Sequence, residues 1–531
     1  MTLLEISELR ISAAGHELVK GISLGVQTGE ILSIVGESGS GKSLTCLSIL
    51  NLLAPNLKVT GSILFHGADG KTQLLGLDPH ARSRFALKHI AYIFQEPLSA
   101  LNPVQTCGKQ LMENIALCGV KTRSEQLARA KKLLVDVELT NTEKVLKSYP
   151  FQLSGGQRQR VMIAMALAGE PELIIADEPT TALDVLLQDE ILGLIKELCR
   201  KQGKSVLFVS HDIDAVYKFS DRIAVMYKGE IVESDRSERI IMQPSHPYTK
   251  ALLECKPKPE KRGTYLSTLA DTMEQRMPQR FQEQETGENV LVKVSDLSKV
   301  YRHAGKAFVA LDHVSFNIRQ GESLGLIGES GSGKSTISKL LVRLENRTGG
   351  DIIYDFSNGK PLTSNVQMIF QDPFSALNPS VKVEDMLQEV IAQHQPELSS
   401  AQVAAQIDEL LLKVGMGPSD KLKYPSNFSG GQRQRLCIAR ALAARPSLLI
   451  CDESTSALDL SVQAQILNLL KSLQIHEHLS ILVITHSMAV AAWFCHYLVV
   501  LKNGKIVEQG EAQELINNPQ DPYTKAMVGH I

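Results

Sequence analysis

Two identical glycine-rich segments have the composition and spacing of a phosphate-binding loop. GESGSGKS occurs at residues 36–43 and again at 328–335, each time after a short apolar run and before a helical pattern. Glycines let the backbone wrap around an anion, so that amide groups and the positive end of the next helix face the phosphate. We therefore expect two nucleotide triphosphate sites, each with its lysine on the β- and γ-phosphates and the following serine hydroxyl on Mg²⁺. The residues assigned to these loops are Gly36, Glu37, Ser38, Gly39, Ser40, Gly41, Lys42 and Ser43 in the first copy, and Gly328, Glu329, Ser330, Gly331, Ser332, Gly333, Lys334, Ser335 and Thr336 in the second.

Each copy also has a pair of neighbouring carboxylates directly after an apolar run. Asp177–Glu178 follow residues 173–176, and Asp452–Glu453 follow residues 448–451. The aspartate of each pair can hold Mg²⁺ through water, and the glutamate can polarise an attacking water as a general base. The alternative is an acidic pair that caps the following helix. Placement after a buried strand, in a chain with phosphate loops, favours the catalytic interpretation.

A glutamine and a histidine complete the polar set of each copy. Gln95 and Gln371 end the runs AYIFQ and VQMIFQ, where an amide can ligate Mg²⁺ or water and respond to the γ-phosphate. His211 and His486 follow further apolar runs and could contact the γ-phosphate from the other side of the site. A lone histidine is more often structural, and only the repeated register favours a catalytic role for these two.

The segment SGGQRQR occurs twice and predicts a second phosphate clamp. Its serine hydroxyl and glycine amides stand at an expected helix start, where backbone N–H groups are unpaired and the helix dipole favours an anion. One copy does not need two clamps, whereas two copies facing head-to-tail can use both. The clamp residues are Ser154, Gly155 and Gly156 in the first copy and Ser429, Gly430 and Gly431 in the second.

The motifs recur at a nearly constant offset, which indicates a tandem duplication. The second histidine, at 486, lies 275 residues after the first, at 211, and SGGQ and the carboxylate pair share this offset. We expect a first domain over 1–255, a linker over 256–289 and a second domain over 290–531. The linker is charge-balanced and contains three prolines, which favours a solvated segment and leaves open a short helix over 268–281.

Short apolar runs and helical periodicity indicate an α/β fold. The runs before the loops, the carboxylates and the histidines suit strands buried on both faces of a parallel sheet. Between Gln95 and Ser154 the pattern becomes helical, and the same change occurs between Gln371 and Ser429. In the first of these regions the helical pattern places Leu127, Ala130, Leu133, Leu134 and Val137 on one side.

Composition excludes several classes of protein. The 531 residues carry a formal net charge of −2, which argues against nucleic acid as a partner. The eight cysteines form no CxxC pair, so a disulfide framework or a zinc ribbon is not expected. No apolar run approaches a membrane span, and the amino terminus does not have the pattern of a secretory signal. We expect a soluble cytosolic multidomain protein.

In their order, the motifs resemble the ATP-binding cassette superfamily. That order is phosphate loop, glutamine, SGGQ, Asp–Glu, an Ala-Leu-Asp segment at 182–184 and 457–459, and histidine, and it spans nearly the whole chain. The resemblance implies two tandem P-loop NTPase cassette domains, each with a RecA-like core, an antiparallel β subdomain and a helical insertion. It also implies ATP and Mg²⁺ as ligands. Tyr301 stands where this family has its adenine-stacking aromatic residue, and the first copy has no aromatic residue at the matching place near Ala13.

Narrower features are similar to the peptide and nickel importer branch, which includes oligopeptide, dipeptide and microcin C importers. These are FQEPLSALNP at 94–103, FQDPFSALNP at 370–379, and the segments HPYTKALL and DPYTKAMV that begin at 246 and 521. This similarity implies an ATPase that works with two integral membrane permeases and a periplasmic or extracellular solute-binding protein. It further implies a peripheral position on the cytoplasmic face of the inner membrane.

Two alternatives come from other classes of protein. A soluble tandem-cassette ATPase acting on ribosomes would need a long basic arm, whereas residues 256–289 are short and charge-balanced. A nucleotide-binding regulator without turnover is disfavoured by two intact glutamates.

The stretches after the two glutamines are candidate docking grooves for a permease helix. They contain prolines together with Leu98, Leu101, Phe374 and Leu377, which the docking interpretation requires to be exposed. The alternative is that these four side chains pack within their own helical insertion.

Overall fold

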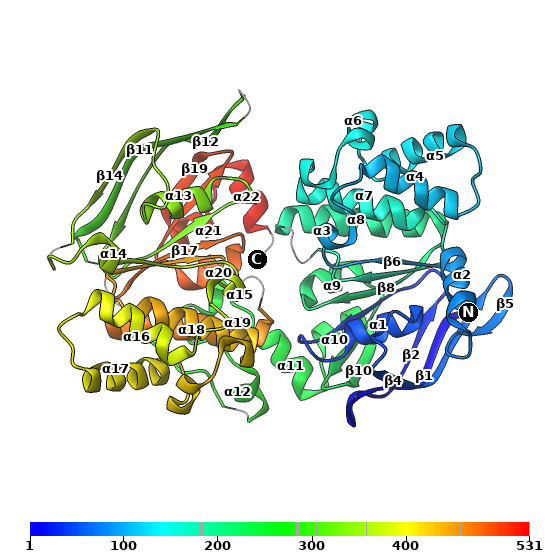
Figure 1. The fold of residues 1–531 in the computed structure, drawn as a ribbon, viewed down its shortest axis with the longest axis horizontal. Coiled ribbons are helices and arrows are strands. Elements are labelled where there is room, and N and C mark those ends of the chain that lie inside the picture. Colours follow the sequence, from blue (N-terminus) through cyan, green and yellow to red (C-terminus); the bar gives the residue numbers. More distant parts are fainter. Residues whose placement is uncertain are drawn as a thin grey trace. The chain divides into compact units, whose positions relative to one another are not determined.

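The computed structural model describes residues 1–180, 184–274, 276–282, 287–303, 306–356, 358–455 and 458–529. The chain divides into two compact units, Met1–Leu253 and Glu254–Ile531 (Figure 1). Each unit is described separately below.

A six-stranded, mostly parallel sheet forms the core of the first unit. Every residue of its three central strands is buried, so these strands read as continuous apolar runs rather than alternating ones. Only its edge pair β9–β10 is antiparallel. In spatial order the strands are β10 (Glu230–Arg236), β9 (Arg222–Tyr227), β3 (Ile31–Val35), β8 (Ser205–Ser210), β7 (Leu173–Asp177) and β6 (Ile90–Ile93).

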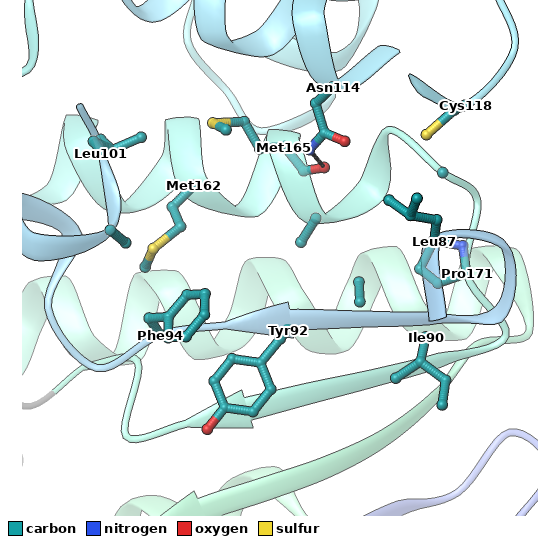
Figure 2. A pocket seen from close by; sticks show the side chains of 14 residues that line it. Leu87, Ile90, Tyr92, Phe94, Leu101, Asn114, Cys118, Met162, Met165 and Pro171 are labelled. Atoms are coloured by element: carbon teal, nitrogen blue, oxygen red, sulfur yellow. Dashed lines mark hydrogen bonds between the residues drawn. The ribbon is translucent and has the colours of Figure 1, made fainter. Parts of the chain in front are cut away.

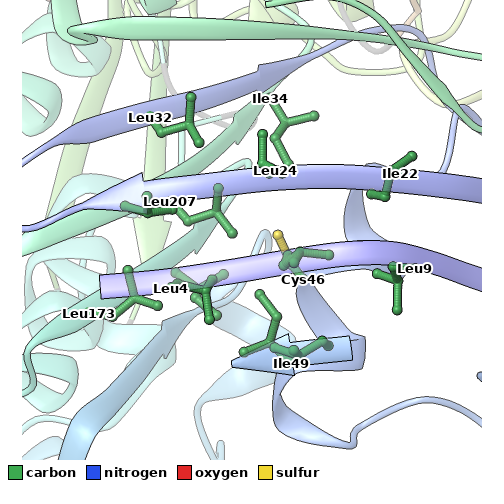
Figure 3. Packing of buried hydrophobic residues seen from close by; sticks show 14 of the residues in the cluster. Leu4, Leu9, Ile22, Leu24, Leu32, Ile34, Cys46, Ile49, Leu173 and Leu207 are labelled. Carbon is green, nitrogen blue, oxygen red and sulfur yellow. The ribbon is translucent and has the colours of Figure 1, made fainter. Parts of the chain in front are cut away.

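An antiparallel sheet packs against this core through a shared hydrophobic cluster. Leu4 and Leu9 of one sheet and Leu32 and Leu207 of the other belong to this cluster, together with Cys46 of the first helix (Figure 3). The sheet therefore rests on the phosphate-loop helix and fixes its position. Its strands are β2 (His16–Gln27), β1 (Thr2–Ala13), β4 (Leu57–Gly67) and β5 (Gly70–Gln73).

In the first unit, most helices come directly after a strand in the sequence. The helices α3 to α6 form an insertion between β6 and α7. The predicted helix face in this insertion is buried at Ala130, Leu133, Leu134 and Val137, but Leu127 is exposed. Of these residues Leu127 lies closest to the start of α5 at Arg123, and it is 39 % exposed. The helices are α1 (Lys42–Leu50), α2 (Pro79–His89), α3 (Pro97–Ala100), α4 (Cys107–Leu117), α5 (Arg123–Asp136), α6 (Thr142–Lys147), α7 (Gly155–Leu167), α8 (Val185–Gln202), α9 (Ile213–Phe219), α10 (Ser237–Met242) and α11 (Pro247–Glu254).

The second unit repeats the same strand order around its own core. The six-stranded sheet again has a mostly parallel arrangement and buried central strands. Within the described part of the chain, its antiparallel sheet has three strands where that of the first unit has four. The core strands are β15 (Val366–Ile369), β16 (Leu448–Asp452), β17 (Ser480–Thr485), β13 (Ser323–Ile327), β18 (Tyr497–Lys502) and β19 (Lys505–Glu511); the others are β12 (Lys306–Arg319), β11 (Val290–His303) and β14 (Gly349–Tyr354).

Helices of the second unit also repeat the order of the first, with two differences. The helix α12 precedes the second cassette, and a 3₁₀ helix, Pro418–Leu422, stands between α17 and α18 where the first unit has α6. The helix before β15 is short, whereas its counterpart α2 has eleven residues. The helices are α12 (Leu269–Met273), α13 (Lys334–Leu341), α14 (Leu362–Asn365), α15 (Pro373–Ala376), α16 (Val383–His394), α17 (Ser400–Lys413), α18 (Gly430–Leu442), α19 (Leu460–Glu477), α20 (Met488–Phe494), α21 (Ala512–Asn517) and α22 (Pro522–Val528).

The segment 256–282, here called the strap, packs on the second unit where the sequence predicted a solvated linker. Trp493 is fully buried, and its Nε1 donates to the carbonyl oxygens of Lys261 at 3.2 Å and Thr264 at 3.1 Å. The side-chain amide of Asn468 pairs with both backbone groups of Leu266, each at 2.8 Å. These contacts satisfy strap backbone groups with side chains of α19 and α20, which the composition of the linker does not reveal.

Two stretches of the strap also pair with each other. Tyr265 N donates to Gln279 O at 2.9 Å, and Phe281 N donates to Gly263 O at 3.0 Å. The Phe281 ring then lies edge-on to Trp493, with a centroid separation of 6.2 Å. The sequence left open a helix over 268–281, and among the described residues of that range the structure forms α12 alone.

Among the described residues, the structure contains no helix with the length and apolarity needed to cross a membrane.

Candidate functional site

Each phosphate loop is closed by its own lysine. In the first unit Lys42 Nζ donates to the carbonyl oxygens of Gly36 at 2.8 Å and Glu37 at 2.9 Å. Lys334 makes the matching pair of bonds at 2.7 and 2.8 Å in the second unit. Both lysines are only 4 % exposed. The ammonium groups are thus held inside the loops, where they can face an anion.

Glycines and an unpaired hydroxyl shape the inside of each loop. Gly41 and Gly333 cap the N-termini of α1 and α13 with φ of 107° and 109°, a backbone conformation that side chains with a Cβ rarely adopt. Ser40 Oγ and Ser332 Oγ are buried, and among the described residues neither has a hydrogen-bond partner. A buried hydroxyl without a partner is costly, so these loops are suited to a polar ligand.

At the carboxyl edge of the first sheet, the structure brings the predicted polar residues together. Ser43 Oγ donates to Asp177 Oδ1 at 3.0 Å. Glu178 Oε2 accepts from Gln95 Nε2 at 3.1 Å and lies 3.1 Å from His211 Nδ1. Burial raises the pKa of Asp177, and hydrogen bonds to its carboxylate oppose this shift.

The second unit assembles the same set with different spacings. Gln371 Nε2 donates to Glu453 Oε2 at 2.7 Å, and His486 Nδ1 lies 3.7 Å from Glu453 Oε1. Burial pushes the pKa of Glu453 upward, but the nearby imidazole and the Lys334 ammonium outweigh it and hold the pKa below its ordinary value. Glu453 is therefore a carboxylate at neutral pH, as a general base must be. Asp452 is 6 % exposed at the end of β16.

The SGGQ serines are N-caps of long helices. Ser154 Oγ accepts from Gln157 N at the start of α7, and Ser429 Oγ accepts from Gln432 N at the start of α18. The glutamine side chain bonds back to the serine backbone in both cases, which forms a capping box. Gly155, Gly156, Gly430 and Gly431 occupy the first helical positions, so their amides face the helix end.

The Ala-Leu-Asp segments are partly beyond what the structure describes. Ala182, Leu183 and Ala457 lie outside the described residues. Asp184 and Asp459 are the N-cap residues of α8 and α19.

Tyr301 lies beside the second phosphate loop. Its hydroxyl donates to Glu345 Oε2 at 2.6 Å and also contacts Thr336, in the first turn of α13. The matching hairpin position of the first unit is Ala13, so the predicted difference between the two copies is present in the structure.

Two tyrosines near the phosphate loops were missed by the sequence reasoning. Glu37 N donates to Tyr248 Oη at 3.0 Å, and Glu329 N donates to Tyr523 Oη at 2.9 Å. Both belong to the PYT segments, which the sequence analysis used only as markers of resemblance. Their separation of 275 residues, from 248 to 523, equals that of the catalytic motifs and could have revealed them.

Comparison with known families identifies the chain. The family described as ABC transporter matches residues 19–181 and 311–456, which contain both phosphate loops. The chain belongs to the ABC transporter family. Two further stretches, 232–283 after the first cassette motifs and 507–531 at the end of the chain, match the family described as oligopeptide/dipeptide transporter, C-terminal region. ABC transporter ATP-binding proteins are ATPases coupled to transport, so the predicted resemblance, fold class and enzyme class are confirmed.

Similar proteins span the whole ABC chain. It is 42 % identical to the uncharacterized ABC transporter ATP-binding protein YejF of Escherichia coli K12, over 99 % of both chains. A peptidoglycan transport ATP-binding protein YejF of Agrobacterium fabrum is 40 % identical over 99 % of this chain and 96 % of its own. The glutathione import ATP-binding protein GsiA of Escherichia coli K12 is 41 % identical over 97 % and 86 %.

A solved structure resembles the tandem ABC fold as a whole. Ribosome-bound archaeal Pelota and ABCE1 match with a TM-score of 0.61 and 20 % identity, covering 98 % of this chain and 80 % of that chain. At this identity the likeness concerns the fold alone. The sequence relatives therefore favour a transport ATPase over the ribosome-acting alternative.

We expect replacement of Tyr301 by Ala to weaken ATP binding severalfold at the site of Lys334. Aromatic stacking contributes roughly 0.5–1.5 kcal/mol beyond area burial. The measurement is titration with a fluorescent ATP analogue in a K42A background, which disables the other loop. Y301F keeps the ring and should bind as the parent does, whereas an unchanged affinity of Y301A would contradict the stacking role.

Proposed function

We propose that this ABC ATPase hydrolyses ATP·Mg²⁺ at two composite sites and thereby drives uptake of peptide-like solutes. The observation that supports this most is the double assembly of lysine, glutamine, carboxylate pair and histidine in a chain whose C-terminal stretches match an oligopeptide transporter family twice. Site one would join Lys42, Ser43, Gln95, Asp177, Glu178 and His211 with Ser429, Gly430 and Gly431. Site two would join Lys334, Ser335, Gln371, Asp452, Glu453 and His486 with Ser154, Gly155 and Gly156.

The donor set fits a nucleotide with its metal. The hydroxyls of Ser40 and Ser332, which have no partner among the described residues, and the enclosed lysines suit phosphate oxygens. Hydroxyl, carboxylate and amide oxygens suit Mg²⁺, which prefers oxygen ligands and keeps several waters. These would be Ser43, Gln95 and Asp177 in site one and Ser335, Gln371 and Asp452 in site two. When bound, Mg²⁺ supplies neutralisation of phosphate charge.

Proton transfer would be the work of the glutamates. Glu178 lies 4.0 Å from Lys42 Nζ, and its other oxygen is held by Gln95 and His211. This places the base beside the phosphate loop in a fixed orientation, ready to accept a proton from the attacking water. The glutamine also directly precedes the helical insertion in the chain. Its contact with the glutamate can therefore transmit the presence of the γ-phosphate to that insertion.

The importer relatives support a proposal for the partners and the location. We propose two integral membrane permeases, fed by a periplasmic or extracellular solute-binding protein, with the ATPase held on the cytoplasmic face of the membrane. The names of the relatives mention glutathione and peptidoglycan transport, which supports a peptide-like cargo.

A cavity in the first unit offers a seat for a permease helix. It encloses about 240 Å³ beside β6, α4 and α7, and Leu87, Phe94, Met162 and Met165 contribute apolar lining (Figure 2). Phe94 is 42 % exposed and directly precedes Gln95. A short amphipathic helix seated there would touch the residue next to the nucleotide-sensing glutamine. This contact would couple movement of the permease helix to the state of the nucleotide.

Only part of the predicted groove is available for docking. Leu101 is 2 % and Leu377 is 3 % exposed, because these residues end α3 and α15 and pack inward under α7 and α18. The docking prediction was wrong for these two. Phe374 is 58 % exposed, and the Arg433 guanidinium lies 4.0 Å from its ring centroid. The side chain of Leu98 lies outside what the structure describes.

We expect the double variant A100R/F374E to uncouple transport. Ala100 is exposed and lines the cavity, so a long charged side chain there would block a helix without disturbing the core. Basal ATPase and melting should match the parent, while import and permease-stimulated ATPase in proteoliposomes should be lost. M242E changes an equally exposed apolar residue on α10 and should have no effect. Retained import, or a lower melting point with lost basal activity, would contradict the docking proposal.

A further inference from the structure

The magnesium-side aspartates of the two units are held by different residues. In the first unit Tyr92 Oη donates to Asp177 Oδ2 at 2.8 Å, while the loop serine occupies Oδ1. In the second unit Ser338 Oγ lies 3.1 Å from Asp452 Oδ2, again opposite the loop serine. Both aspartates are more than nine-tenths buried, so their orientation depends on such fixed donors.

On the sheet side, Tyr92 and Met368 occupy the same position. Tyr92 of β6 pairs in register with Ile175 of β7, and Met368 of β15 pairs with Ile450 of β16. Each of these isoleucines stands two residues before its aspartate. A thioether has no proton to donate, so the second unit has no hydroxyl from this strand.

On the helix side, the second unit has the stronger hydrogen-bond donor, whereas on the sheet side the first unit has it. Cys46 and Ser338 each follow their loop lysine by four residues and are fully buried. A thiol is a weak donor and a hydroxyl a strong one. Each unit therefore has one strong donor for the second carboxylate oxygen, from the sheet in the first unit and from the helix in the second.

We propose that Tyr92 and Ser338 are interchangeable positioning residues that orient the metal-binding carboxylate of their own site. The proposal rests on the proposed binding of ATP·Mg²⁺ at both loops. Tyr92 gives its proton to Asp177, whereas the single Ser338 proton is divided between Asp452 and the Ser335 carbonyl oxygen at 3.0 Å. Asp177 is consequently held more firmly, and site one binds the divalent cation more tightly than site two.

The test measures Mn²⁺ affinity by electron paramagnetic resonance in ATP-loaded protein that cannot turn over. In an E178Q/E453Q/K334A background, which reports site one, Y92F should weaken Mn²⁺ binding by about tenfold, as expected for a partner of a metal ligand. Adding C46S should restore the affinity to within about twofold, because the serine supplies the hydroxyl from the helix side. In an E178Q/E453Q/K42A background, S338A should weaken binding at site two, and S338A/M368Y should restore it.

Controls separate this effect from folding and from the proposed function. M368L removes no hydroxyl and should leave Mn²⁺ affinity at site two unchanged. All variants should melt as their background does and bind ATP equally in the presence of EDTA. Parental Mn²⁺ affinity in Y92F, or a C46S variant that melts normally but does not restore binding, would overturn the proposal. Failure of the background protein itself to bind Mn²⁺ with ATP would instead contradict the proposed function.

Discussion

Replacement of both glutamates, E178Q/E453Q, is expected to abolish hydrolysis while ATP binding is retained. Gln keeps the size of the side chain and can still bond to Gln95 or Gln371, but it cannot accept a proton from water. Removal of one positioned general base typically costs about 10²–10⁴ in rate. Phosphate release at saturating ATP measures the effect, and filter binding of radiolabelled ATP shows that the loops still work.

Two comparisons make this result decisive. E238Q/E514Q changes two exposed glutamates on α10 and α21 and should hydrolyse ATP as the parent does. E178Q and E453Q alone should each leave less than half of the parental rate if the sites are coupled. Hydrolysis by the double variant within tenfold of the parent would show that other groups act as the base.

Ser429→Asp is expected to eliminate stable ATP binding at the loop of Lys42, in the other unit. Aspartate is as good an N-cap as serine, so α18 should remain capped. Its carboxylate would stand where the head-to-tail arrangement places a γ-phosphate, and like charges in close contact cost several kcal/mol, or roughly a hundredfold or more. ATP retained through rapid gel filtration in the E178Q/E453Q background measures this.

Combination with loop variants shows which loop shares a site with Ser429. S429D/K42A should retain one ATP per chain, and S429D/K334A should retain none. The opposite result would mean that each clamp serves the loop of its own unit. Ser399 is a matched control, because it also caps a helix of the second unit with a capping box, and S399D should retain both nucleotides.

The sequence contained enough information to predict the core strands and the polar residues at their ends. A strand covered on both faces must be apolar throughout, so the runs before Asp177 and Asp452 were recognisable without any partner. The nucleotide-facing motifs were also local, since a phosphate loop is one turn followed by one helix. Their gathering around Glu178 and Glu453 follows from parallel strands that end at the same edge of a sheet.

Contacts between distant segments could not be predicted in the same way. The strap looked solvated because its anchor, Trp493, lies 232 residues after Lys261. Neither segment contains a sequence pattern that indicates contact with the other. Leu101 and Leu377 looked exposed because a four-residue helix has too few positions to show a periodic face. Tyr92 was read only as part of an apolar run, and its bond to Asp177 depends on the register of two neighbouring strands.

The strap also sets the length of chain that links the two cassettes. Because it is fastened to the second unit from Lys261 onwards, only a few residues after Leu253 remain as a tether to the first unit. Short tethers give effective concentrations in the millimolar range. Under the proposed head-to-tail arrangement, closure of the two halves would therefore be a unimolecular event that dilution does not weaken. Fusion also places one copy of each half in every molecule. Each molecule therefore has one site with Tyr92 and one with Ser338 beside the aspartate. This allows the two sites to specialise without assemblies that contain two copies of the same half.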